Sequence, residues 1–278
     1  MTTSTNVKKT SEILVTIALG EDYRLFYDTY FRKSQEDFAK RHGMDFLAIY
    51  EPIVRSQKHP SWQKLLIFKH PQIAEYERVV FVDADIYITQ TADNPSNLVP
   101  PEYWGMVDNN SYKLESLEIT DPPLYVNCPK DYTPPLMLNG GFFIANRKEH
   151  QELFENIFLT YPEQNCYEQG PLSYSLQRYC NRGIVLPSTY NAVLAAYRMK
   201  FGKGLSKIID FFDDNYFIHF AGGIPIIFVR MLIMLDRKPN HLLTKMLRLV
   251  SGRYLDPFTT ILLRILSLLK KMGQNYYI

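Results

Sequence analysis

The segment that most constrains this chain is VVFVDADIYI, residues 79–88, in which an apolar β-branched run leads into two aspartates. Such a run is typical of a strand buried on both faces of a sheet. In an extended segment, the i and i+2 spacing puts Asp83 and Asp85 on the same side. Adjacent carboxylates repel each other and are costly to bury, so we expect a compensating divalent cation with oxygen ligands. A solvated turn or helix cap is the alternative.

Apolar runs and helical patterns alternate along the rest of the chain, whose 278 residues suffice for one sizeable domain. This alternation predicts an α/β fold with a mixed, mostly parallel sheet flanked by helices. In such a sheet, ligands bind at the carboxyl ends of the strands. The expected strands are residues 13–19, 45–50, 79–88, 105–108, 141–146, 183–186 and 216–220, and the expected helices are 22–41, 61–69 with Ser61 as cap, 149–161 and 168–179.

Two further motifs place polar residues beside predicted elements. In LNGGFFIANR, residues 138–147, Gly140 and Gly141 remove side chains where another group has to approach the backbone closely. The amide of Asn139 can donate and accept, which suits sugar hydroxyls, although an ordinary turn is an equally good interpretation. In YEQGPLSYSL, residues 167–176, Glu168 and Gln169 lie at the first turn of a helix, where the helix dipole alone favours an acidic residue.

A histidine lies in the strand-like run FIHFAGG, residues 217–223. In an apolar run of this kind, His219 is more often a buried structural residue. Opposite a paired-Asp site it is also a sensible third metal ligand, and an imidazole ligand favours manganese over magnesium.

Charge is distributed unevenly along the chain. Residues 224–278 contain nine Lys or Arg against two Asp, so this tail carries +7 and residues 1–223 carry −5 of the total +2. An acidic body argues against a nucleic-acid partner. Short apolar stretches interleaved with cations predict a basic, amphipathic helical tail on an anionic membrane surface, with packing on the domain or a dimer contact as the alternative.

The expected location is cytoplasmic, and peripheral on the inner face of a membrane if the tail binds lipid. The three cysteines show neither paired nor metal-ligand spacing, which fits a reducing compartment. The first dozen residues, MTTSTNVKKTSE, are polar and do not match a signal peptide.

Taken in order, these segments resemble GT-A glycosyltransferases, in particular the retaining group of glycogenin and bacterial lipopolysaccharide galactosyltransferases, glycosyltransferase family 8. Related galactosyl- and xylosyltransferases with a WxKL segment are also similar, and WQKL occurs here at residues 62–65. The resemblance covers residues 13–225. It implies a GT-A catalytic domain at residues 1–223 before the tail, a nucleotide-sugar donor, most simply a UDP-sugar, and a saccharide or glycolipid acceptor.

Carried over by position, the resemblance assigns roles to individual residues. Asp83, Ala84 and Asp85 correspond to the D-x-D motif that holds manganese and the donor diphosphate, and His219 corresponds to the third metal ligand. The other corresponding residues are Ala18, Leu19 and Tyr23 around the base, Lys64 at the donor sugar or phosphate, Asn139, Gly140 and Gly141 around the transferred sugar, Glu168 and Gln169 beside the reacting carbon, the aromatic-Asn pair Tyr190 and Asn191, and Gly222 after the histidine.

Two departures from the family pattern keep other interpretations open. Ile224 stands where the family has a phosphate-binding Lys, and Glu168 replaces the commoner Asp. A nucleotidylyltransferase of sugar phosphates has similar paired carboxylates, but IALGEDYR at residues 17–24 is a poor version of its Gly-rich, basic loop. The missing Lys favours a non-catalytic sugar-nucleotide-binding protein. We expect acceptor choice to lie in the Pro- and Tyr-rich segment 109–135.

Overall fold

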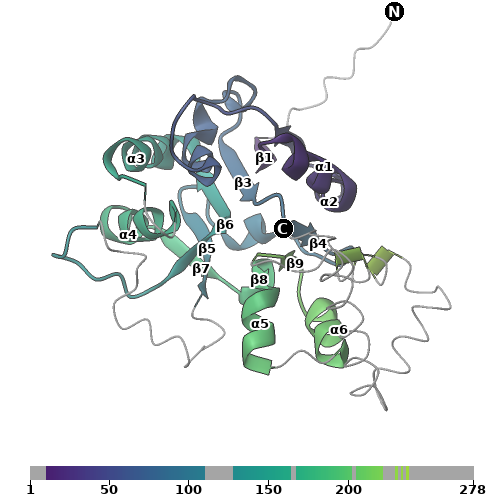
Figure 1. Ribbon diagram of the computed structural model, residues 1–278. Helices are drawn as coiled ribbons and strands as arrows, with labels where there is room; N and C mark the ends of the chain where they lie inside the picture. Colours follow the sequence, from purple (N-terminus) through teal and green to yellow (C-terminus); the bar gives the residue numbers. More distant parts are fainter. Residues whose placement is uncertain are drawn as a thin grey trace, which may run out of the picture.

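The fold is seen in a computed structural model that describes residues 11–109, 128–163, 167–201, 205–221, 229–230, 233 and 236–237 (Figure 1). The strands are β1 (Glu12–Ile17), β2 (Asp45–Ile49), β3 (Arg78–Val82), β4 (Ile86–Ile88), β5 (Trp104–Asp108), β6 (Leu138–Asn146), β7 (Gly183–Leu186), β8 (Ala192–Val193) and β9 (Phe217–His219). The α-helices are α1 (Glu21–Tyr30), α2 (Arg32–Arg41), α3 (Arg147–Thr160), α4 (Gln169–Tyr179), α5 (Leu194–Phe201) and α6 (Leu205–Asp213).

These strands form a six-stranded sheet of order β2-β1-β3-β6-β5-β7 and a smaller sheet of order β4-β9-β8. In the large sheet β1, β2 and β3 are parallel, as are β5 and β7, and β6 runs antiparallel to both of its neighbours. Every strand of this sheet except β6 therefore runs in the same direction. The predicted mixed, mostly parallel sheet flanked by helices is confirmed.

The two faces of the large sheet are covered by different helices (Figure 1). Side chains alternate along each strand, so Val15 and Phe81 pack with α3, α4 and the 3-10 helix η1 (Pro60–Lys69) on one face. Leu14 and Val80 pack with Phe38 of α2 on the opposite face. Burial on both faces explains the nearly continuous apolar runs of these strands.

The segment 79–88 is not one strand. β3 ends at Val82, and β4 begins at Ile86 in the other sheet, where it pairs antiparallel with β9. A tight turn joins them, closed by the Ile86 N–H donating to the Asp83 carbonyl at 3.1 Å. Gln35 of α2 stabilises it by donating to the Ile86 carbonyl at 2.9 Å. The expectation that Asp83 and Asp85 lie on one extended segment was therefore wrong, because a residue distant in sequence favours the turn.

Two helix predictions also need correction. The helix expected at 22–41 is interrupted at Phe31, which separates α1 from α2. The segment expected as a helix capped by Ser61 is the ten-residue 3-10 helix η1, and His59 caps it by accepting from the Ser61 N–H. All seven residues from Trp62 to Phe68 are buried, so this segment lies in the interior and does not show the single apolar face of a surface α-helix.

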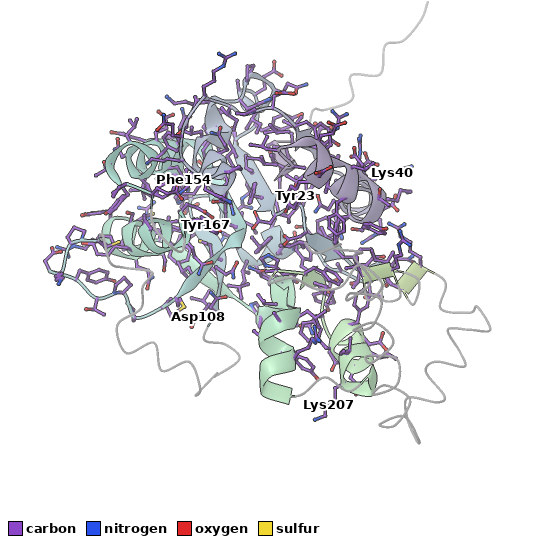
Figure 2. The ribbon with its side chains drawn as sticks, in the orientation of Figure 1. Tyr23, Lys40, Asp108, Phe154, Tyr167 and Lys207 are labelled. Atoms are coloured by element: carbon purple, nitrogen blue, oxygen red, sulfur yellow. The ribbon has the colours of Figure 1, made fainter. Side chains whose placement is uncertain are left out.

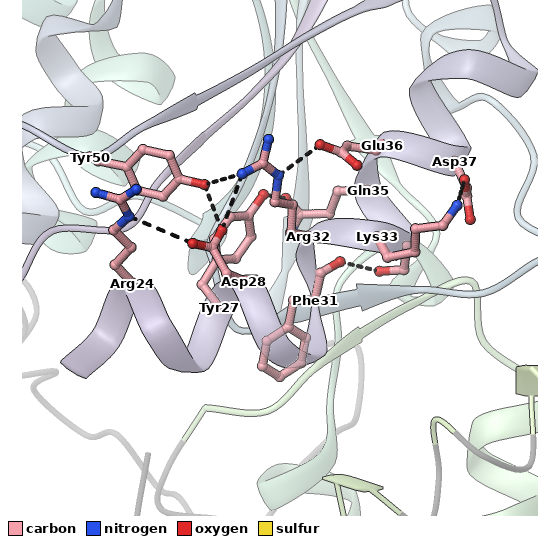
Figure 3. A network of polar contacts seen from close by, with 11 residues as sticks. Arg24, Tyr27, Asp28, Phe31, Arg32, Lys33, Gln35, Glu36, Asp37 and Tyr50 are labelled. Atoms are coloured by element: carbon pink, nitrogen blue, oxygen red, sulfur yellow. Dashed lines mark hydrogen bonds and ion pairs between the residues drawn. The ribbon is translucent and has the colours of Figure 1, made fainter. Parts of the chain in front are cut away.

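A polar network joins α1, α2 and the residue after β2 across the break at Phe31 (Figure 3). Arg32 donates to Glu36 at 2.7 Å and to the Tyr50 hydroxyl at 3.0 Å. Tyr50 in turn donates to Asp28 at 2.6 Å. These contacts hold the end of α1 and the start of α2 beside the carboxyl end of β2.

Most of the predicted tail, residues 224–278, lies outside the described residues, as do Gly222 and residues 110–127 of the segment proposed for acceptor choice. Val229 and Ile233 are described and are buried in a cluster with Tyr30 and Tyr87. Tyr87 donates to Asp236 at 2.7 Å. These tail residues thus pack on the domain, while the boundary at residue 223 stays a prediction. Among the described helices, none has the length and apolarity that crossing a bilayer requires.

Candidate functional site

A cavity of about 570 Å³ lies where β1 and β3 end and β6 begins, the edge at which ligands bind in open α/β sheets. Tyr23 of α1 and Tyr167, ahead of α4, both line it, and both are labelled in Figure 2. Its polar lining consists of residues from six separate parts of the chain: Tyr23, His59, Ser61, Lys64, Asp83, Asp85, Asn139, Tyr167, Glu168, Gln169 and His219.

The structure brings together the three predicted metal-ligating side chains. One ligand atom from each of Asp83, Asp85 and His219 lies within 4.8 Å of the other two. The pairing of β4 with β9 produces this arrangement, because it puts Ile86 opposite His219 and lets the Phe220 N–H donate to the Asp85 carbonyl at 3.0 Å. His219 Nε2 lies 3.3 Å from Asp85 Oδ1, with both side chains buried.

Lys64 is the centre of a second charged cluster. Its ammonium group lies 2.8 Å from Asp83 Oδ1, 2.9 Å from Glu168 Oε1 and 3.0 Å from the Gly140 carbonyl. These acceptors match its three N–H donors. Burial disfavours the charged form, but the carboxylates of Asp83 and Glu168 outweigh it, and the pKa of Lys64 is raised. Lys64 therefore stays a cation that supports the two carboxylates from inside the fold.

The two aspartates have opposite pKa shifts. Burial dominates for Asp83 and raises its pKa, although Lys64 opposes the effect. Burial also acts on Asp85, but the charge of His219 and its hydrogen bond lower the Asp85 pKa overall. The pKa of His219 is raised because Asp85 outweighs the effect of burial. The site thus favours a charged Asp85 beside a ring that tends to hold a proton, and a divalent cation bound here would have to displace that proton.

The predicted base-binding loop has one part that lines the cavity and one part that is buried. Leu19 and Tyr23 line the cavity. Ala18 and Ala84 are buried in a hydrophobic cluster, so only their backbone is available to a ligand. Burial, followed by the charges of Asp85 and Asp83, raises the pKa of Tyr23 well above its usual value. Tyr23 is therefore a neutral phenol at physiological pH.

The glycine pair of LNGGFF allows side chains to approach the backbone. A Cβ on Gly140 would lie 3.0 Å from Glu168 Oε1, and a Cβ on Gly141 would lie 2.5 Å from the His219 ring. The Asp83 N–H donates to the Gly141 carbonyl at 2.7 Å, which anchors the glycines to the aspartate turn. The expected close approach exists, and the approaching groups include two side chains of this protein.

Glu168 and Gln169 both line the cavity, with Gln169 beginning α4. One carboxylate oxygen of Glu168 binds Lys64. The other, Oε2, is buried and accepts no hydrogen bond from the described residues. A buried carboxylate oxygen of this kind is free to accept a hydrogen bond from a ligand.

Sequence reasoning missed two aromatic residues at the cavity. Tyr167 has a positive φ of 52°, which is uncommon for a residue with a bulky side chain. Its ring stacks on His59 with centroids 3.9 Å apart. The position of Tyr167 beside Glu168 was a usable signal for a site residue. Its contact with His59 across more than a hundred residues had no local signal.

Comparison of the sequence with family models and with curated proteins gives no match. Among solved structures, the fold is similar to that of a glycosyltransferase involved in the glycosylation of the major capsid of PBCV-1. The two share 15% sequence identity with a TM-score of 0.53, over 80% of this chain and 98% of that chain. At this identity the similarity shows the fold, and the chain has the mixed α/β architecture expected of the GT-A type.

Proposed function

We propose that this protein is a metal-dependent glycosyltransferase that moves a sugar from a nucleotide-diphosphate donor to a saccharide or glycolipid acceptor. The observation that carries the proposal is the convergence of Asp83, Asp85 and His219 at the ligand-binding edge of the sheet. The similarity in fold to a glycosyltransferase supports it. The motif order favours a UDP-sugar donor and retention of configuration, as in glycosyltransferase family 8.

The residues at the site fit a divalent cation. Two carboxylates and one imidazole form a mixed oxygen and nitrogen donor set, which manganese accepts more readily than magnesium does. When bound, such a cation would neutralise negative charge on a departing diphosphate. Asp83, Asp85 and His219 would hold it.

The remaining polar residues have complementary tasks in this proposal. Lys64 keeps Asp83 and Glu168 in place through contacts of 2.8 and 2.9 Å. Glu168 Oε2, which has no hydrogen-bond partner among the described residues, would accept from a hydroxyl of the transferred sugar. The Gln169 amide would bind the same sugar, and Tyr23 would stack on the base.

The test is to incubate the full chain with manganese, a panel of UDP- and GDP-sugars and candidate acceptors, and to identify the products. We expect release of the nucleoside diphosphate, its loss in EDTA, and loss of at least tenfold in kcat/KM for Asp85→Asn. Asp37→Asn is a matched control, because Asp37 is an exposed partner of Lys33 on α2.

Other outcomes would contradict the proposal in distinguishable ways. Activity that survives EDTA would exclude the metal role. Release of pyrophosphate would indicate a nucleotidylyltransferase. Stable binding of the nucleotide sugar without turnover would indicate a sugar-nucleotide-binding protein.

We further propose that residues 224–278 place the protein on the cytoplasmic face of an anionic membrane, near a glycolipid acceptor. The tail's charge of +7 supports this, since each basic residue near such a surface adds to the attraction. In a flotation assay with vesicles containing phosphatidylserine, deletion of residues 257–278 should release the protein. Unchanged flotation would contradict the proposal.

A further inference from the structure

Two buried asparagines form a hydrogen-bonded chain behind His219. Asn191 is 1% exposed, and its Nδ2 donates to Asn139 Oδ1 at 2.9 Å. Its Oδ1 lies 2.9 Å from His219 Nδ1. The other ring nitrogen, Nε2, faces Asp85. The chain of amides therefore contacts the edge of the imidazole that does not face the acidic pair.

A backbone N–H group sets the direction of this chain. The Gly141 N–H lies 2.8 Å from one amide atom of Asn139, and because it can only donate, that atom has to be the carbonyl oxygen. The Asn191 atom facing the same oxygen then has to be the NH₂ group. This leaves the Asn191 carbonyl oxygen facing His219, so Nδ1 has to carry a hydrogen.

We propose that Asn139 and Asn191 are positioning residues that hold His219 in its Nδ1–H tautomer and leave the Nε2 lone pair for a cation at Asp83 and Asp85. This inference rests on the metal site of the proposed function. It gives Asn139, predicted as a sugar contact, a different task. The Gly141 N–H and Asn191 already occupy its oxygen, and Asn109 accepts from its Nδ2 at 2.8 Å.

The glycine at position 141 supports this assignment independently. A Cβ there would lie 2.5 Å from His219 Cε1, and 3.0 Å from both His219 Nδ1 and Asn139 Oδ1. The backbone φ of Gly141 is not in the left-handed region, so a glycine is favoured here because it has no side chain to occupy this space. The ring and the amide can lie against the backbone at this point because no side chain is present.

The decisive measurement is the tautomer of His219 in the full chain, labelled with ¹⁵N-histidine and free of metal and donor, at a pH where the ring is neutral, because Asp85 raises the His219 pKa. Long-range ¹H–¹⁵N NMR distinguishes the two neutral tautomers, and a His219→Gln sample assigns the signal among the six histidines. We expect the Nδ1–H form in the native chain. Observation of the Nε2–H form would overturn the proposal, whatever any variant does.

Variants then separate positioning from sugar binding. Asn191→Leu and Asn139→Leu should lose the single tautomer, and their Mn²⁺ affinity, measured by EPR, should fall about 10–100-fold. Asn139→Asp keeps the oxygen that accepts from Gly141 and Asn191 and should retain the tautomer. If a folded Asn139→Leu keeps both the tautomer and the Mn²⁺ affinity and changes only the donor KM, Asn139 is a sugar contact and its proposed positioning role is wrong.

The results also separate this proposal from the proposed function. An Nδ1–H tautomer in a chain that neither binds Mn²⁺ nor releases a nucleoside diphosphate would support the positioning of His219 by the two asparagines but contradict the enzymatic function. Metal-dependent turnover with an Nε2–H tautomer would support the enzymatic function but contradict the positioning role of the two asparagines.

Discussion

Replacing Lys64 with methionine keeps the length and apolar stem of a buried side chain but removes its charge and its N–H donors. Lys64 is 4% exposed and contacts Asp83, Glu168 and the Gly140 carbonyl at 2.8, 2.9 and 3.0 Å. Without it, two carboxylates that share one cation would face each other. The substitution therefore tests whether Lys64 is a structural counter-charge.

The size of the effect follows from burial. Removing one partner of a buried ion pair costs about 3–5 kcal/mol, because the other charge stays buried without compensation. The Asp83 side chain is 28% exposed and regains water, which favours the lower end of that range, about 3 kcal/mol. At about 2–4 °C per kcal/mol for a domain of this size, Tm should fall by about 6–12 °C.

Thermal unfolding followed by circular dichroism measures this change. Lys69→Met is the matched control, because Lys69 lies on the same 3-10 helix but is 45% exposed and pairs with Glu155 at the surface. Its Tm should change by no more than about 4 °C, since surface pairs contribute about 0–1 kcal/mol. The double variant Lys64→Met with Glu168→Gln should recover part of the loss. If the Tm of Lys64→Met lies within about 2 °C of the Tm of the Lys69→Met control, the counter-charge argument is wrong.

Three further substitutions test other contacts. Gly141→Ala should lower Mn²⁺ affinity at least tenfold in EPR titration, because its Cβ would displace the His219 ring; unchanged affinity would exclude that steric argument. Gly183→Ala should lower stability in urea unfolding by about 1–3 kcal/mol, since its Cβ would lie 2.0 Å from Trp104, yet leave Mn²⁺ affinity unchanged. Gln35→Leu removes a buried donor from the aspartate turn. The free energy of unfolding should therefore fall by about 1–3 kcal/mol, and Mn²⁺ affinity should fall as well. If neither quantity changes, the role given to Gln35 is wrong.

The class of fold could be predicted because apolar periodicity is a local property. The strand expected at residues 45–50 is β2, and the helix expected at 168–179 is α4, each within a residue of its expected bounds. Burial of the sheet on both faces appears directly in runs such as residues 13–17.

The form of the segment 79–88 could not be predicted from its own residues. The residues on both sides of Asp83 and Asp85 have the same strong preference for strands, so nothing local marks the turn between β3 and β4. The turn depends on Gln35 and on the pairing of β4 with β9, which come from distant parts of the chain. Local preference and tertiary contact disagree at the site, and the tertiary contacts prevail.

By itself, the sequence determined which chemical groups exist: two carboxylates after a buried run, a histidine before two glycines, and an acidic-Gln pair at a helix start. The tertiary structure decided what each group contacts. Lys64, predicted to bind the donor, is held by Asp83 and Glu168, and Asn139 accepts from Asn191. These pairings join residues far apart in the chain, and their energies depend on burial and on angles that a one-dimensional pattern does not contain.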